Sequence, residues 1–282
     1  MALSETGPLS LGEILDRMFA VYRRNFLLLV LMYGLPIIFA IPIVGVVFVD
    51  LIKSINPADV EQTANSFQSA LGMFFLLFVL MWVVSVLAWL ATTSAVWEIQ
   101  MGGKPTIRSS YAKAWKRLGI GLVSGFLGMI AFFLGYIFFI IPGILVALGI
   151  SLTPSILAVE RLGPIASIQR SWSLSNGYRW RIFVSALICY FMTAAMGYGV
   201  MIPAMIVLPN MVTGGGTIHM WILIVFGVAY ALAIMLPAPL LAIALCLIYY
   251  DARVRKEGFD LQRMIDSLAQ PAPGAAQAPL AG

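Results

Sequence analysis

The sequence TPSILAVERLGPIASIQRSWSLSNGYRWR, from Thr153 to Arg181, contains the elements from which we predict the whole chain to be built. Its apolar beginning ends at Glu160, and Gly163-Pro164 then breaks the chain. A short amphipathic helix with Arg170 and Trp172 is predicted next. A basic aromatic cluster, which leads into a new apolar segment, closes the stretch: Tyr178, Arg179, Trp180 and Arg181.

The same order of features recurs elsewhere in the chain. Glu98 and Asp251 end two other apolar segments, and Arg23-Arg24 and Lys116-Arg117 begin two others. Each repeated unit is therefore marked by basic residues where an apolar segment begins and by an acidic residue where an apolar segment ends. We infer that the protein consists of repeated membrane hairpins, each entered through a basic helix at the interface.

The composition is that of an integral membrane protein. Hydrophobic residues make up 61% of the chain and charged residues 10%, whereas soluble domains carry about 25% charged residues. A transmembrane helix needs about 20 mostly apolar residues, and several segments exceed this length. Once these segments are subtracted, no extended soluble domain remains.

We predict an all-α, polytopic membrane protein with six transmembrane helices in three hairpin repeats. The predicted spans cover residues 25–49, 70–97, 119–140, 143–159, 182–208 and 220–250. The predicted interfacial helices cover residues 10–24, 106–117 and 164–176. Residues 1–269 form a single membrane domain, and the tail 270–282, rich in Pro, Ala and Gly, is expected to be disordered.

Local signals support several of these boundaries. Ser10 and Glu13 have the spacing of a capping box at the start of the first interfacial helix. Ile141-Pro142-Gly143 is the predicted turn inside the long uncharged segment 119–159. The predicted topology places every Lys and Arg residue except Lys53, out of 17, on one side. The positive-inside rule makes that side, with both termini, cytoplasmic.

The basic interfacial helices are candidates for binding anionic lipid headgroups. Each basic residue near an anionic leaflet contributes about 1 kcal/mol of attraction. The alternative is that they are ordinary snorkelling and aromatic anchors. The candidate residues are Arg17, Arg24, Lys113, Lys116, Arg170, Trp172, Arg179 and Arg181.

The carboxylates Glu98, Glu160 and Asp251 each lie at the end of a predicted span, where the helix dipole disfavours negative charge. We expect structural ion pairs there, with partners such as Lys116, Arg179 or Arg24. Ion coordination or proton handling by these carboxylates is the alternative.

Catalytic signals are missing from the sequence. No H-E-x-x-H, G-x-S-x-G or Walker motif occurs, and His219 is the only histidine. We therefore expect no enzyme activity, no metal, no cofactor and no nucleic-acid partner. A membrane-embedded lipid enzyme would require Glu160 and Asp251 to converge at a polar pocket.

Transport is the main alternative function. Hairpin repetition and proline-interrupted helices favour it, but no ionisable residue lies near the middle of any predicted span. Polar side chains that would line a path are Thr92, Ser94, Ser151 and Thr153.

Several motifs resemble one known family. The segments Pro8–Arg17 and Tyr22–Phe26, the Ile141-Pro142-Gly143 turn, Arg170-Ser171-Trp172-x-Leu174 and Tyr249–Asp260 resemble bacterial proteins of the glycerophosphoryl diester phosphodiesterase membrane domain family. The resemblance extends over residues 8–264. The resemblance implies that the chain is a bacterial inner-membrane protein that corresponds to the membrane region of this family. The soluble catalytic barrel that gives the family its name is missing, so no catalytic residue is carried over.

These observations lead us to expect a non-enzymatic protein that organises or senses the membrane. It would act at its cytoplasmic face, through anionic lipid headgroups or a partner protein.

Overall fold

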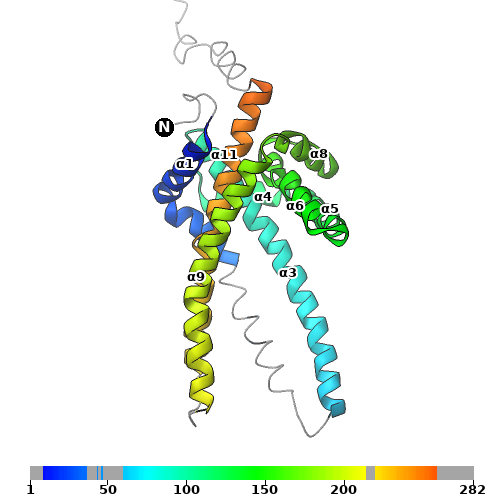
Figure 1. The fold of residues 1–282 in the computed structure, drawn as a ribbon, viewed down its shortest axis with the longest axis vertical. Coiled ribbons are helices and arrows are strands. Elements are labelled where there is room, and N and C mark those ends of the chain that lie inside the picture. The colour runs from blue at the N-terminus through cyan, green and yellow to red at the C-terminus, as the bar shows by residue number, and fades with distance from the viewer. Residues whose placement is uncertain (1–8, 37–42, 44–45, 47–59, 214–219, 259–282) are drawn as a thin grey trace, which may run out of the picture.

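The computed structural model describes residues 9–36, 43, 46, 60–213 and 220–258, and this part of the chain is all-helical (Figure 1). The helices are α1 (Leu11–Arg24), α3 (Val60–Gln100), α4 (Ile107–Trp115), α5 (Leu118–Phe138), α6 (Ile140–Ile150), α7 (Thr153–Val159), α8 (Pro164–Ser175), α9 (Arg179–Thr213), α10 (Met220–Met235) and α11 (Ala238–Glu257). Much of the predicted first span, together with Lys53, His219 and the tail 270–282, lies outside the described residues.

Five described helical segments are long and apolar enough to cross a membrane: Leu71–Gln100, Leu118–Phe138, Ile140–Val159, Arg179–Val207 and Ile224–Glu257. A sixth is counted if α1 and the following helix Phe26–Pro36, bent by 83° relative to each other, form one broken span. The described residues are thus all-helical, as predicted, and their long apolar helices fit the multi-pass membrane protein that the composition predicts.

The helix starts follow from local chemistry. The predicted capping box at α1 is present, with the Ser10 hydroxyl accepting from Glu13 N and the Glu13 carboxylate accepting from Ser10 N. Thr106 and Ser109 form the same reciprocal pair at α4. Such caps satisfy backbone donors that have no partner within the helix. The first and second predicted interfacial helices therefore begin where the sequence places them.

The predicted sixth span is divided at Leu236-Pro237 into α10 and α11. Proline removes a backbone donor and ends a helix. The Tyr22 hydroxyl donates to the Leu236 carbonyl at 2.5 Å, so α1 satisfies an acceptor at this break. A second proline, Pro239, lies in the first turn of α11.

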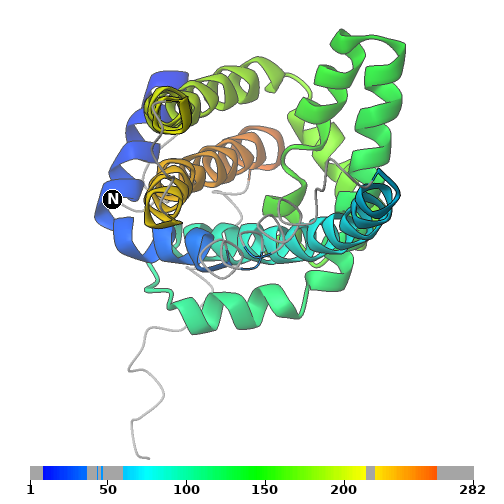
Figure 2. The same cartoon turned by 90° about the horizontal axis from the view of Figure 1, so that it is seen from below.

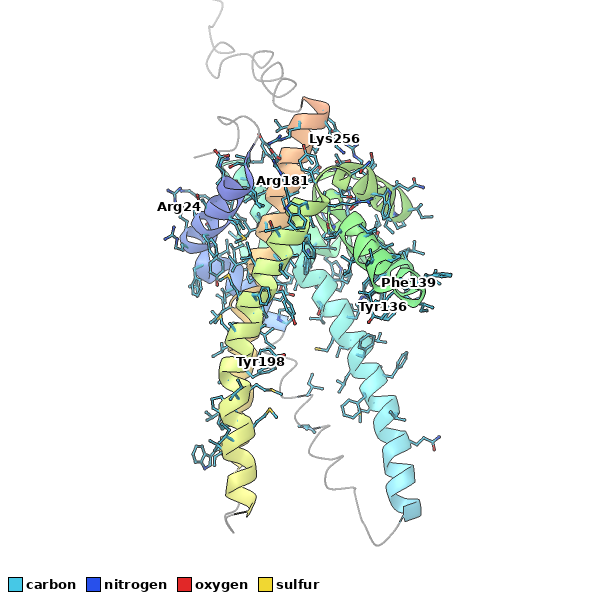
Figure 3. The ribbon with its side chains drawn as sticks, viewed as in Figure 1. Arg24, Tyr136, Phe139, Arg181, Tyr198 and Lys256 are labelled. Atoms are coloured by element: carbon cyan, nitrogen blue, oxygen red, sulfur yellow. The ribbon has the colours of Figure 1, made fainter. Side chains whose placement is uncertain are left out.

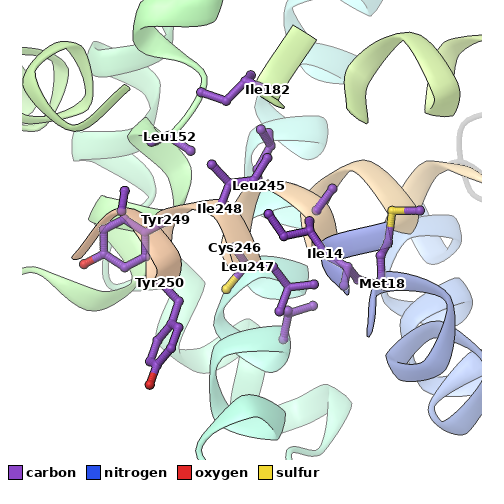
Figure 4. Close-up of a cluster of buried hydrophobic side chains, with 14 of the residues drawn as sticks. Ile14, Met18, Leu152, Ile182, Leu245, Cys246, Leu247, Ile248, Tyr249 and Tyr250 are labelled. Carbon is purple, nitrogen blue, oxygen red and sulfur yellow. The ribbon is translucent and has the colours of Figure 1, made fainter. Parts of the chain in front are cut away.

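The central helix of the bundle is α11. Seen along the long axis, it lies within a ring formed by α1, α3, α8 and α9, all of which it contacts (Figure 2). Its residues Ala242–Ala252 are all buried. Ile14, Met18, Leu152 and Ile182 of the surrounding elements meet this helix in the main apolar core (Figure 4). The stretch Thr153–Arg181, from which we predicted the organisation of the chain, is not the centre of the bundle but packs around α11.

The described cations gather at one end of the bundle. They lie on α1, on α4 and its flanking loops, around α8, at the start of α9 and in the last turns of α11 (Figures 1 and 3). At this end α4 is fixed to the helix Phe26–Pro36, because the Tyr111 hydroxyl donates to the Met32 carbonyl at 2.5 Å. Burial raises the pKa of Tyr111 to about 12, which extends the pH range over which this hydroxyl can donate.

Candidate functional site

Asp251 is the most deeply buried charge at the cationic end, with 1% of its side chain exposed. Its carboxylate accepts from the Leu9 backbone N–H at 2.7 Å, from Arg181 Nη1 at 3.0 Å and from Arg255 Nε at 3.1 Å. Both guanidinium groups also donate to the Leu9 carbonyl at 2.8 Å. The start of the described chain is thereby attached to α9 and α11.

A second ionic network surrounds Glu160. Its carboxylate accepts from Arg170 Nε at 3.2 Å and from the Tyr249 hydroxyl at 2.7 Å, and Arg253 Nη1 lies 3.8 Å away. Glu257 pairs with Arg170 and also accepts from Arg253 Nε at 3.2 Å. Burial acts against the charged form of Arg170, but the carboxylates of Glu160 and Glu257 raise its pKa. This network joins α8 and the end of α7 to α11.

The third carboxylate, Glu98, pairs with Lys113 across the α3–α4 hairpin. Both side chains are accessible, with 30% and 55% exposed. Solvent therefore screens this pair more than the other two.

Replacing Glu98 with Gln is expected to have little effect, lowering the free energy of unfolding by less than about 1 kcal/mol. The physical reason is that water can hydrate Lys113 once its partner is neutral. Unfolding in mixed micelles, followed by circular dichroism, measures this value. A loss above about 2 kcal/mol would show that the pair acts as a buried one.

All three carboxylates form ion pairs, as predicted, but with other partners than the residues named as examples. Glu98 pairs with Lys113 and not Lys116, and Glu160 pairs with Arg170 and Arg253 and not Arg179. Asp251 pairs with Arg181 and Arg255 and not Arg24. The expected partners were residues that open the following or a neighbouring unit, whereas α11 brings residues that are distant in sequence together around Glu160 and Asp251.

Part of these networks has a recognisable signal in the sequence. Arg255 lies four residues after Asp251, and Glu257 lies four residues after Arg253. Residues at this spacing are neighbours on a helix surface. Leu9 had no such signal, because it contributes only its backbone groups.

The segment Arg170-Ser171-Trp172-Ser173-Leu174-Ser175 holds α8 against the break between α6 and α7. The hydroxyls of Ser171 and Ser175 donate to the Gly149 carbonyl at 2.8 and 3.2 Å. Ser171 also accepts from Leu152 N at 3.2 Å. These bonds satisfy backbone groups that the helix break leaves without partners inside the helix.

Trp172 connects this packing to the cationic surface. Its ring lies so close to Gly149 that a Cβ atom built there would be 2.2 Å from Trp172 Cε3. The Arg179 guanidinium stacks on the ring, with Cζ 4.4 Å from a ring centroid. The two predicted headgroup candidates therefore form one cation–π unit, with 43% of Trp172 exposed.

The predicted headgroup residues thus divide into two groups. Lys113, Arg170 and Arg181 are in ion pairs, so we remove them from the candidate headgroup surface. Arg17, Arg24, Lys116 and Arg179 have no ion pair within the described residues. We call the described cations outside α11 that lack such a pair the unpaired cations: Arg17, Arg23, Arg24, Lys104, Arg108, Lys116, Arg117, Arg161 and Arg179.

Two of the four hydroxyl side chains that could line a transport path form hydrogen bonds to nearby backbone carbonyls. Ser151 donates to the Leu148 carbonyl and Thr153 to the Ile150 carbonyl, at 2.8 and 2.6 Å. Both residues line a largely apolar groove of about 550 Å³ between α3, α5 and the α6–α7 region. Thr92 is buried and its hydroxyl has no partner among the described groups.

Within the described residues, no group of three His, Cys, Asp or Glu side chains is placed to hold a metal ion. Comparisons with protein-family models, with curated proteins and with solved structures find no match to this chain. The described part of the chain fits the class of all-helical, multi-pass membrane proteins, and its charged end is held together by partly buried ion pairs.

Proposed function

We propose that this chain is a non-enzymatic membrane protein that organises or senses the membrane by binding anionic lipid headgroups at its cationic end. The observation that carries the proposal is the set of unpaired cations. They lie on α1, on α4 and its flanking loops, around α8 and at the start of α9, at the same end of the bundle (Figure 1), while the ion pairs use other residues. A cation without a carboxylate partner remains available for an external anion.

Electrostatics supports a lipid surface as the partner. Each basic residue near an anionic leaflet contributes about 1 kcal/mol, so several of them produce substantial attraction together. Trp172 and Arg179 place an aromatic ring and a cation side by side on this surface. Aromatic and basic side chains of this kind are typical of the headgroup region of a membrane. An acidic partner protein is the other occupant that this surface suits.

The geometry favours the two alternative functions less. Glu160 and Asp251 bind different sets of arginines, and the oxygens of both carboxylates are engaged by these hydrogen bonds and ion pairs. Ser151 and Thr153 both donate to carbonyls in the last turn of α6, and such local bonds are common for hydroxyls in membrane helices. We therefore propose neither lipid chemistry nor transport.

We also propose that the cationic end is cytoplasmic, in a bacterial inner membrane, and that the chain is built of three hairpin repeats related to the membrane part of the glycerophosphoryl diester phosphodiesterase membrane domain family. The positive-inside rule supports the orientation. The repeat is supported by α1, α4 and α8, each of which precedes an apolar helix. The motifs that suggest the family include Arg170, Ser171 and Trp172, which have specific contacts here.

The test combines Arg24→Gln, Lys116→Gln and Arg179→Gln in one variant. Loss of three charges is expected to weaken binding to phosphatidylglycerol vesicles by roughly 100-fold, from about 1 kcal/mol per residue. Vesicle binding and the phosphatidylglycerol and cardiolipin that co-purify with the protein are measured.

The matched control keeps every charge, with Arg24→Lys, Lys116→Arg and Arg179→Lys. It should retain anionic lipid, because the attraction depends on charge at the surface. If the Gln variant binds vesicles and retains lipid as the unmodified protein does, the headgroup proposal is incorrect. The surface would then be left for an acidic protein.

A further inference from the structure

The hairpin formed by α5 and α6 is inclined to the long axis of the bundle. In the side view its tip ends well short of the lower ends of α3 and α9, and seen from below both of its helices extend sideways (Figures 1 and 2). Figure 3 shows Tyr136 and Phe139 at a level between Arg24 and Tyr198. The tip therefore lies on the cationic side of Tyr198.

The other long helices extend much further in the same direction. From Tyr198, α9 continues to Thr213, which is roughly 22 Å of helix at about 1.5 Å per residue. With 21 residues, α5 is long enough to cross a hydrocarbon core of about 30 Å if it stood upright. Its inclination, and not its length, keeps the tip away from the far end of the bundle.

The tip is made of large apolar side chains. Ile137, Phe138 and Phe139 are 76%, 75% and 76% exposed, and Ile140 and Ile141 are 60% and 70% exposed. Turns that face water favour Gly, Asn, Asp and Ser. Moving each such side chain from water into hydrocarbon contributes about 1.5–3 kcal/mol, so this tip strongly favours the membrane interior.

The backbone of the turn is suited to an apolar environment. Phe139 is the only residue between the two helices; its N–H donates to the Gly135 carbonyl at 3.2 Å, and its carbonyl accepts from Gly143 N at 3.3 Å. Pro142 has no backbone donor to satisfy. The turn thus leaves fewer unpaired groups than an open loop would, which lowers the cost of placing it in lipid.

Two glycines allow this close turn. A Cβ atom on Gly135 would lie 3.1 Å from Gly143 Cα, and one on Gly143 would lie 3.0 Å from Tyr136 Cα. The helices therefore pack backbone against backbone beside the tip. This rigid closure presents the aromatic and aliphatic side chains outward.

We propose that the α5–α6 hairpin is a re-entrant element: it enters and leaves the bilayer at the cationic face, and its tip contacts lipid acyl chains without reaching the opposite face. Length and hydropathy do not report inclination, so the sequence alone predicts two crossings here, 119–140 and 143–159. Both arrangements place Leu118 and Val159 on the same side. The inference is independent of the proposed headgroup binding.

The test places a single cysteine at the tip of the full-length protein. Cys189 and Cys246 are buried and are replaced by Ala. Phe139→Cys is then exposed to a membrane-impermeant maleimide in vesicles of both orientations. We expect no labelling from either side. Ala166→Cys, on the exposed surface of α8, is the control for the cationic side, and His219→Cys is the control for the opposite side that the charge pattern predicts.

A second measurement makes the absence of labelling informative. A bimane fluorophore, attached in detergent at residue 139, is reconstituted with lipids that carry a nitroxide either on the acyl chain or on the headgroup. We expect the acyl-chain nitroxide to quench the fluorophore at least twofold more strongly. Ile137→Cys serves as a second reporter if Phe139→Cys does not fold. Labelling from the side that also labels His219→Cys, or stronger quenching from the headgroup, would overturn the proposal.

Discussion

Asp251→Asn is expected to lower the free energy of unfolding by about 3 kcal/mol, the lower part of the range for breaking a buried ion pair. The substitution keeps the shape of the side chain but removes the charge that faces Arg181 and Arg255. Asp251 is 1% exposed, whereas the arginines are 26% and 33% exposed. Because water can partly hydrate both arginines, we expect a loss in the lower part of the range for buried ion pairs.

The loss is measured by unfolding in mixed micelles with increasing SDS, followed by circular dichroism and tryptophan fluorescence. Glu98→Gln is the matched control, because it also neutralises one carboxylate of an ion pair but at an accessible position. Equal losses in the two variants would show that burial does not govern the strength of these pairs. Hydrogen exchange should also become faster at Leu9 N–H, which donates to Asp251.

Gly149→Ala is expected to cost about 1–3 kcal/mol through overpacking. The new methyl group would lie 2.2 Å from Trp172 Cε3 and 2.4 Å from Cζ3, so the ring or the helix must move. Movement of α8 would also weaken the bonds from Ser171 and Ser175 to the Gly149 carbonyl. The same unfolding assay measures the loss.

A double-mutant cycle separates this clash from a general effect of alanine. Trp172→Ala removes the ring, so the Gly149→Ala and Trp172→Ala double variant should lose less stability than the sum of the two single variants. Gly119→Ala is the control, since nothing lies within 4 Å of the added methyl group. It should be neutral or stabilising by up to about 1 kcal/mol, because alanine favours helix over glycine. Additive losses in the cycle would contradict the proposed clash.

Local patterns in the chain were sufficient for much of the architecture. Helical membrane segments follow from continuous apolar sequence, and the start of α1 follows from Ser10 and Glu13. The turn was predicted at Ile141-Pro142-Gly143, and the helix break lies two residues earlier, at Phe139. These features depend on interactions between residues a few positions apart, which is the range that sequence periodicity and capping report.

In contrast, the central position of α11 and the ion-pair partners of its charged residues depend on long-range packing. Asp251 meets Leu9 and Arg181 across 242 and 70 positions of the chain. The contact of Gly149 with Trp172 and the inclination of the α5–α6 hairpin likewise have no local signature. Hydropathy reports whether a helix prefers lipid, but the direction in which it lies depends on how its side chains fit those of its neighbours. That fit is a property of surfaces that meet only after folding.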